Sequence, residues 1–151
     1  ILDQRRTVRR DGSHHDILGC AYAGGKKAED AVKQAVHTAL NEAGVGISEV
    51  DLVLLNAAFP PDESQTALLQ EWFCGKPVLS LNDQYGYAES LSCMLHLAAA
   101  AELVHCGQST GILQHSEALR DKPIRRVLTL SISLNGNCYA AVISQMETKI
   151  S

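Results

Sequence analysis

The segment from Leu91 to Ala101 is small or apolar at nearly every position, and this feature limits the possible folds most strongly. A helix that is apolar on all sides is buried either in a protein core or in a membrane. Glu89, Glu102 and His105 flank the segment, and its apolar stretch is shorter than the roughly 18 residues that a bilayer span requires. We therefore expect a helix over 87–106 that lies in the middle layer of a protein, between two sheets.

The rest of the sequence alternates between patterns typical of strands and of helices. Short apolar runs without alternation, as in Leu52–Ala58, are typical of strands covered on both faces. Apolar residues at three- and four-residue spacing, as in Lys26–Ala43, predict amphipathic helices. The predicted order is a strand at 17–23, a helix at 26–43, a strand at 52–58, a helix at 62–75, a strand at 78–81, the buried helix, and a hairpin of strands at 127–134 and 138–144 around Asn135 and Gly136. We therefore expect an α/β domain with a mixed sheet.

Composition narrows the class of protein further. The chain has 151 residues, of which 46% are hydrophobic and 20% charged, which is enough for one core, and we treat residues 1–151 as a single domain. Its formal charge of −4 argues against general binding to nucleic acid or to membrane surfaces. Without a leader or a spanning segment, the chain is expected to be soluble and cytoplasmic.

Cysteine spacing and motif searches predict no metal or cofactor. The five cysteines are scattered and include no C-x-x-C pair, so neither a disulfide framework nor a zinc site is indicated. The chain also has no P-loop, no G-x-G-x-x-G and no H-E-x-x-H motif.

Five segments, in order, resemble the C-terminal half of a β-ketoacyl-acyl-carrier-protein synthase, or ketosynthase, of the thiolase-like fold. Residues 17–23 resemble the family's "ILGYG" strand, residues 26–49 its helix ending in "ALADAGLSPDDID", and residues 53–57 its "YINA" strand. Residues 86–107 resemble its buried helix "GHTEAASGIAGLIKAALALRHG", and residues 131–143 its hairpin "NSFGFGGTNAxLV". The resemblance implies a mixed five-stranded sheet, a buried central helix and helices on the outer face.

The catalytic positions of this family are changed. Family members use a nucleophilic cysteine from the N-terminal half and two histidines from the C-terminal half, which stabilise charge as a malonyl unit loses carbon dioxide. This chain has Ala58 at the first histidine position and Tyr87 at the second. A neutral phenol cannot do the acid–base work of an imidazole near neutral pH. The resemblance therefore implies no catalytic residue in this chain.

A second pair of changes points the same way. The family has a lysine before the second histidine and a glutamate at the start of an earlier helix, where this chain has Asn82 and Gln65. Loss of the lysine alone would leave a buried carboxylate unpaired, whereas two amides can coexist without charge. We therefore interpret the changes at these positions together as the loss of the whole catalytic site.

What remains resembles a chain-length-factor subunit, which pairs with an active ketosynthase in fatty-acid-like or polyketide assembly. Such a subunit or fragment would complete a dimer and shape the acyl tunnel. The pocket candidates are Phe59, Tyr87, Leu134 and Asn135, with ordinary core packing as their alternative role.

The resemblance also implies partners. They are an N-terminal ketosynthase-like half, supplied by a separate chain or a cleaved precursor, an active ketosynthase subunit and an acidic acyl carrier protein. Without the missing half, one sheet and one side of the buried helix would expose a large apolar surface. The basic candidates for carrier-protein contact are Arg5, Arg6, Arg9, Arg10, Arg120, Arg125 and Arg126.

Two alternatives stay open. The chain could belong to an active acyltransferase complex whose nucleophilic cysteine and catalytic histidine come from another chain. It could also be an independent enzyme that uses a cysteine and a histidine of its own. The candidates for that chemistry are His96 and His105 with Cys93 or Cys106, and the cluster Ser13, His14, His15 and Asp16. A histidine on an apolar helix is more often a satisfied core residue, and a thiol on a buried helix is normally inert.

Overall fold

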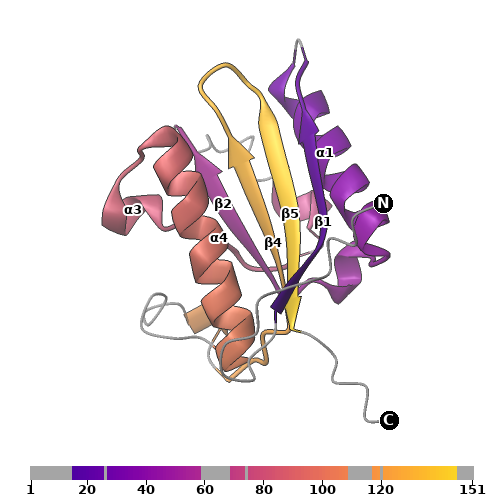
Figure 1. Ribbon diagram of the computed structural model, residues 1–151, viewed down its shortest axis with the longest axis vertical. Helices are drawn as coiled ribbons and strands as arrows, with labels where there is room; N and C mark the ends of the chain where they lie inside the picture. Colours follow the sequence, from indigo (N-terminus) through magenta and orange to yellow (C-terminus); the bar gives the residue numbers. More distant parts are fainter. Residues whose placement is uncertain are drawn as a thin grey trace, which may run out of the picture.

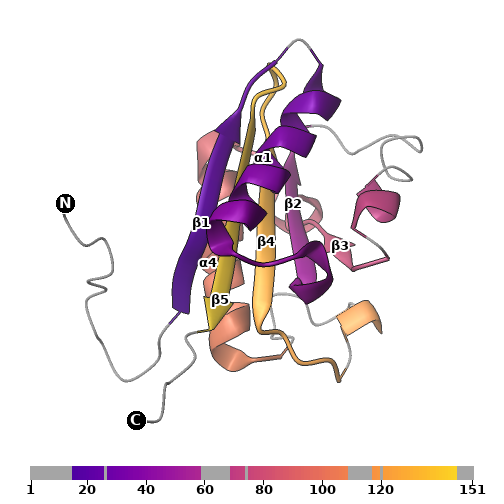
Figure 2. The same cartoon turned by 90° about the vertical axis from the view of Figure 1, so that its right-hand side faces the viewer.

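The computed structural model describes residues 15–25, 27–58, 69–73, 75–108, 117–119 and 121–145. These residues form a five-stranded sheet with α1 and α4 on its opposite faces (Figures 1 and 2). The strands are β1 (His15–Ala23), β2 (Leu52–Ala57), β3 (Val78–Leu79), β4 (Arg126–Ile132) and β5 (Cys138–Gln145). The helices are α1 (Ala28–Ala43), α3 (Asn82–Tyr85) and α4 (Glu89–Cys106), with short 3-10 helices at Ile47–Glu49 and Glu117–Leu119 and helical residues at 69–72.

The strand order is β1-β5-β4-β2-β3, and the sheet is mixed as predicted. Strand β5 runs antiparallel to both β1 and β4, whereas β2 is parallel to β4 and β3. The continuous apolar run of β2 is explained by its central place. Val53 and Leu55 pack in the core on the α1 side, and Leu52 and Leu54 pack in the core on the α4 side. Both faces of the strand are therefore covered, and no polar alternation is possible.

Helix α1 lies unusually close to the edge strand β1. Its buried stripe is Ala31, Val32, Ala35 and Ala39, and the small alanines allow this approach. A Cβ atom added at Gly19 would lie 2.3 Å from the carbonyl oxygen of Ala39 and 2.7 Å from the nitrogen of Ala43. Glycine is therefore required at this position of β1, because only a residue without a side chain fits there.

A β-bulge in β1 changes which side chains face α4. Ile17 pairs with Ile143 and Gly19 pairs with Val142, so Leu18 is the extra residue. A bulge reverses the alternation of the strand beyond it. As a result Ile17 faces the α4 side of the sheet together with residues 20 and 22.

Helix α4 differs from the expected all-round burial. Its inner face, which includes Ser92, His96, Ala99 and Leu103, is buried against the sheet. Its outer face is open, and Leu91 and Met94 are 71% and 63% exposed. Within the described part of the chain no second layer covers this face (Figure 1). Helix α4 therefore packs against one sheet, whereas we expected it to lie between two.

The remaining elements agree with the predicted order, with one addition. The polar stretch after β3, to which the sequence analysis assigned no element, contains the one-turn helix α3. Most of the helix predicted at 62–75 lies outside the described residues. No described helix combines the length and the apolar character that a membrane crossing needs.

Candidate functional site

Three polar side chains meet at the carboxyl ends of β2 and β4, next to the start of α3. Asn82 Nδ2 donates to Asn56 Oδ1 and to the carbonyl oxygen of Ala57, both at 3.1 Å. Asn56 Nδ2 in turn donates to Ser131 Oγ at 2.8 Å. Asn56 and Ser131 are register partners in adjacent parallel strands, so the sheet itself brings them together. We call Asn56, Asn82 and Ser131 the amide cluster.

The amide cluster is neutral and its orientation is fixed. Reversing the Asn82 amide would place its oxygen against the oxygen atoms of Asn56 and Ala57, so the hydrogen bonds decide the assignment. Asn56 is only 1% exposed. Asn82 Oδ1 is buried and has no hydrogen-bond partner in the structure. A buried acceptor without a partner is unfavourable, so the cluster is not fully satisfied.

The two positions where the resemblance places histidines are close to this cluster in the sequence, directly after Ala57 and five residues after Asn82. Ala58 follows β2 directly and offers only a methyl group. Tyr87 lies between α3 and α4 and is partly exposed. Burial, and then the nearby Glu89 and Cys93, raise the pKa of the Tyr87 phenol above its ordinary value. Tyr87 is therefore neutral at neutral pH and can donate one hydrogen bond.

The hairpin between β4 and β5 carries two of the predicted pocket residues at its tip. Leu134 is 62% exposed, and the Asn135 side chain accepts hydrogen bonds from the Ser133 hydroxyl and the Asn137 backbone. Gly136 has a φ of 80°, which favours glycine at the turn. Phe59 and Gln65 lie outside the described residues.

A cavity of about 350 Å³ lies between α4 and the open part of the sheet. Its apolar walls include Ile17, Tyr22, Leu97, Tyr139 and Ala141. Its polar and thiol-bearing residues are Asn56, His96, Thr129, Ser131, Cys20 and Cys93. Tyr87, Leu134 and Asn135, the described pocket candidates, are not among its lining residues. His96 and Cys93, which the sequence analysis named as candidates for cysteine and histidine chemistry, do line it.

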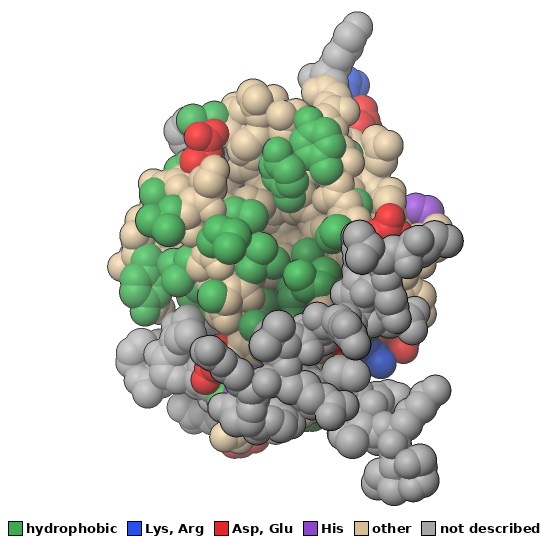
Figure 3. All heavy atoms as spheres, in the orientation of Figure 1, with side chains coloured by type: hydrophobic (Ala, Val, Ile, Leu, Met, Phe, Trp, Pro, Cys, Tyr) green, Lys and Arg blue, Asp and Glu red, His purple; other side chains and the backbone are tan. Residues whose placement is uncertain are grey.

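Hydrophobic side chains gather over this face of the molecule (Figure 3). The rings of Tyr22 and Tyr139 contact each other across β1 and β5 in a tilted arrangement, with centroids 5.0 Å apart, and the two residues are 57% and 48% exposed. Together with Ile17, Leu91 and Met94 they form what we call the open face. Apolar patches of this kind on soluble proteins usually contact another protein surface.

His96 is a core residue whose two ring nitrogens both contact the backbone. Leu81 N donates to Nε2 at 3.2 Å, and Nδ1 lies 2.7 Å from the carbonyl oxygen of Ser92. Burial lowers the pKa of His96, although the carbonyl groups of Ser92 and Leu55 oppose this effect. These contacts agree with the interpretation of His96 as a satisfied core histidine.

The described cysteines give little support for thiol chemistry. Cys106 Sγ donates to Glu102 Oε1 at 3.3 Å, and this hydrogen bond raises the pKa of the thiol. Burial raises the pKa of Cys138 to about 12. A reactive cysteine needs a lowered pKa. His105 is exposed at the end of α4, Ser13 and His14 lie outside the described residues, and no cluster of three metal-binding side chains occurs in the described ranges.

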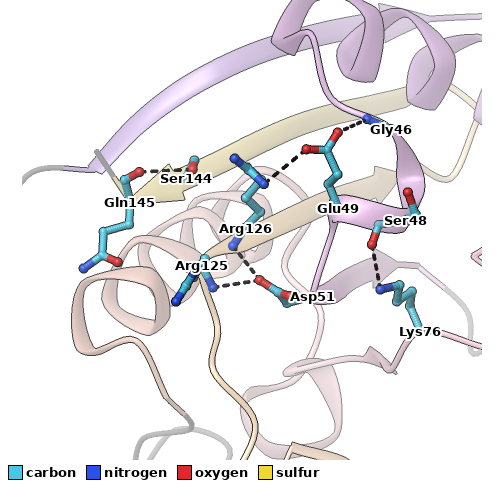
Figure 4. A network of polar contacts seen from close by, with 9 residues as sticks. All are labelled: Gly46, Ser48, Glu49, Asp51, Lys76, Arg125, Arg126, Ser144 and Gln145. Atoms are coloured by element: carbon cyan, nitrogen blue, oxygen red, sulfur yellow. Dashed lines mark hydrogen bonds and ion pairs between the residues drawn. The ribbon is translucent and has the colours of Figure 1, made fainter. Parts of the chain in front are cut away.

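Arg125 and Arg126, two predicted carrier-protein contacts, lie at the amino end of β4 (Figure 4). Asp51 Oδ2 accepts hydrogen bonds from both of their backbone nitrogens, at 2.8 and 3.0 Å. Arg126 also pairs with Glu49 at 3.5 Å and is half-buried, whereas Arg125 is exposed. Ser131 of the amide cluster lies five residues after Arg126 in β4, which corresponds to about 17 Å along the strand. The two arginines are therefore distant from the amide cluster. The remaining arginine candidates, at positions 5, 6, 9, 10 and 120, lie outside the described residues.

No protein-family model and no curated protein matches this sequence. Its fold, however, matches solved structures. The ishigamide ketosynthase/chain length factor has a TM-score of 0.68 and 17% identity, over 87% of this chain and 38% of that one. A type II polyketide synthase acyl-carrier protein in complex with its ketosynthase, bound to the hexaketide, gives a TM-score of 0.66 and 17% identity, over 88% and 39% of the two chains. The 3-oxoacyl-[acyl-carrier-protein] synthase III from Aquifex aeolicus VF5 gives 0.62 and 15%, over 90% and 55%.

These comparisons show what the chain shares with the solved structures. At such identities the shared property is the fold, and the chain has the thiolase-like α/β fold of a ketosynthase half. It spans less than two fifths of the first two matched chains and about half of the third. The mixed five-stranded sheet predicted from the sequence is confirmed.

Proposed function

We propose that the chain is a non-catalytic ketosynthase-like subunit, or part of one, with a role similar to that of a chain length factor. The observation that carries the proposal is the chemistry of the residues at three positions of the site, Ala58, Asn82 and Tyr87, together with the hydrogen bonds that engage the Asn82 amide. A methyl group, a neutral amide and a phenol stand where the resemblance places two histidines and a lysine. No described side chain of this site carries a positive charge.

The hydrogen-bond geometry supports a loss of catalysis. Decarboxylation of a malonyl unit needs donors aimed at the oxygen atom on which negative charge develops. The Asn82 amide directs its donors to Asn56 and Ala57, and the Asn56 amide donates to Ser131. These donors are engaged within the protein. Tyr87 keeps one hydroxyl donor but cannot become a cation.

The open face supports pairing with a second ketosynthase-like half. Leu91 and Met94 on α4, with Tyr22 and Tyr139 on the sheet, expose apolar surface that soluble monomers rarely tolerate. More than half of the matched ishigamide chain lies outside the part that this chain matches. We propose that an equivalent half, on the same or another polypeptide, covers the open face. The resulting subunit would then pair with an active ketosynthase and help to shape its acyl tunnel.

An acyl carrier protein is the second proposed partner. The matched polyketide complex contains one with its ketosynthase. Of the described arginine candidates, Arg125 is the freer one, because Arg126 is held by Glu49. Replacement of Arg125 by glutamate should weaken carrier binding in low salt, whereas the same change at the exposed Lys33 should not. Equal effects would remove Arg125 from the interface.

Substitution of Tyr87 tests the non-catalytic role directly. In the assembled complex, Tyr87→Phe should leave the condensation rate within about twofold of wild type, because the phenol is not used in catalysis. Tyr87→Ala should instead shift the distribution of product chain lengths. A fall in rate of about 100-fold or more in Tyr87→Phe would show that Tyr87 takes part in the reaction. It would support the alternative of an active acyltransferase.

Cysteine labelling tests the pairing. Cys20 and Cys93 line the cavity beside the open face, whereas Cys106 is exposed at the far end of α4. In the complex, an alkylating agent should modify Cys106 and leave Cys20 and Cys93 protected. Addition of mild denaturant that separates the partners should make both reactive. Equal labelling of Cys20, Cys93 and Cys106 in the intact complex would contradict coverage of this face.

A further inference from the structure

His96 joins α4 to the segment that leads into α3. Its Nε2 accepts the backbone hydrogen bond of Leu81, and its Nδ1 donates to the carbonyl oxygen of Ser92. His96 is 1% exposed and Leu81 is fully buried, so both contacts are formed in the interior of the protein. One nitrogen acts as acceptor and the other as donor, which is possible only for a neutral imidazole.

Leu81 is the residue directly before α3, at its N-cap position. The α3 helix has only four residues, no side chain caps it, and Gln84 and Tyr85 both donate to the carbonyl oxygen of Leu81. A single turn of helix is not stable by itself. Its position therefore depends on contacts at its start, namely the burial of Leu81, the bond from Leu81 to His96 and the bond from Asn82 N to Ser80 Oγ.

The same segment carries Asn82, the outer member of the amide cluster. Asn82 reaches β2 through its bonds to Asn56 and Ala57. A shift of Leu81 would move Asn82 directly, because the two residues are adjacent. We propose that His96 is a proton-sensitive latch: the neutral ring holds the 81–85 segment, and with it Asn82, against β2, and protonation of the ring releases the segment.

The surroundings of His96 favour this behaviour. A protonated ring would lose its acceptor and place an N–H group against the N–H group of Leu81. The titratable residues that share its cavity are Cys20 and Tyr22 from β1, Tyr139 from β5 and Cys93 from α4.

Strands β2 and β4 contribute Asn56, Thr129 and Ser131 to the cavity lining, and these side chains do not titrate. The carboxylate on α3, Asp83, is exposed and lines a different cleft together with Lys76. No described carboxylate lines the cavity to stabilise a charge on the ring. The carbonyl groups of Ser92 and Leu55 favour the protonated ring, but burial outweighs them. The pKa of His96 is therefore lowered below 6.5, and the latch stays closed at neutral pH.

In the family segment that residues 86–107 resemble, the position of His96 is a glycine, which has no side chain to hold Leu81. The role of His96 does not depend on the proposed function of the chain. It concerns the order of the 81–85 segment, whichever partner covers the open face.

Hydrogen–deuterium exchange of the assembled protein tests the latch. Peptides covering 78–88 are followed well above and well below pH 6.5 and corrected for the intrinsic pH dependence of exchange. In wild type, acidification should speed exchange in this segment by about two- to tenfold, the effect of losing one hydrogen bond. Peptides from the buried centre of β4 should not change.

Two variants complete the test. His96→Gln keeps an acceptor that cannot be protonated, so its exchange in 78–88 should be independent of pH. His105→Gln, on the exposed end of the same helix, should behave as wild type. A pH-independent wild type, or a His96→Gln protein that keeps the wild-type pH dependence, would overturn the proposal. If His96→Gln does not fold, a pH titration of the histidine ¹⁵N resonances of the wild type provides the test. Protonation of His96 Nε2 must then occur at the same pH as the rise in exchange.

Discussion

Asn82 Nδ2 lies 3.1 Å from Asn56 Oδ1, and this contact joins the start of α3 to the end of β2. The same Asn82 nitrogen also donates to the carbonyl oxygen of Ala57, so one neutral amide makes both contacts. The contact thus gives Asn82 a structural task. It explains how a site without charged groups can remain ordered.

Removal of the Asn82 amide should destabilise the protein. Asn82→Ala leaves Asn56 Oδ1 and the Ala57 carbonyl group without a donor, which should lower the free energy of unfolding by about 1–3 kcal/mol. Combining this change with Asn56→Ala in a double-mutant cycle should give a coupling energy of about 0.5–3 kcal/mol. Urea unfolding of the assembled protein provides the measurement. Additive effects would mean that the two amides do not stabilise one another. Asn41→Ala, at an exposed position of α1, serves as the control.

Because α1 packs closely on β1, the addition of a single methyl group at Gly19 should lower the free energy of unfolding substantially. Gly19→Ala would place its Cβ 2.3 Å from the Ala39 carbonyl oxygen, which is a backbone atom and cannot rotate away. We expect a loss of about 1–3 kcal/mol in thermal or urea unfolding. Gly25→Ala is the matched control, since the nearest atom to an added Cβ there is 3.9 Å away. Equal stability of the two variants would show that α1 can move aside.

Much of this fold could be predicted from the sequence, because its elements carry strong local signals. The covered strand β2, the amphipathic helix α1 and the hairpin at Asn135 follow from periodicity and turn chemistry. The bulge at Leu18 has no local signal, so the common face of Ile17, Cys20 and Tyr22 was not predictable. The part of the cavity wall that β1 contributes was missed for this reason.

The candidate site was predictable only in part. Sequence resemblance located Ala58, Asn82 and Tyr87, but it gave no sign that Asn82 would contact Asn56. That contact depends on α3, whose four residues show no helical pattern. The role of His96 also depends on tertiary structure, because its partner Leu81 is fifteen residues away in the chain.

Protonation of His96 should make the protein less stable in mild acid. Burial lowers the pKa of His96 in the folded state below its ordinary value of 6.5, so the unfolded chain binds more protons between the two values. The free energy of unfolding should therefore be highest above pH 6.5 and fall as the pH drops below it. Urea unfolding across this range should show the slope in wild type and in His105→Gln, but a smaller slope in His96→Gln. The same slope in all three proteins would place its origin elsewhere.

The outer face of α4 should control association. Leu91→Ser and Met94→Ser remove exposed apolar side chains that a partner would bury, and each should weaken pairing by about tenfold or more. The same changes should raise the solubility of the separated chain. Sedimentation of the complex measures the effect, with Asn41→Ser on α1 as the control. Unchanged affinity in both α4 variants would exclude this face from the interface.

Native mass spectrometry of the protein, isolated from its source together with its companions, tests the central claim most directly. A ketosynthase-like subunit of this kind should be found in a complex that contains the complementary half, on the same or a second polypeptide, and an active ketosynthase. A lone 16.3 kDa species that unfolds cooperatively would contradict the account, since the open face would then need no partner.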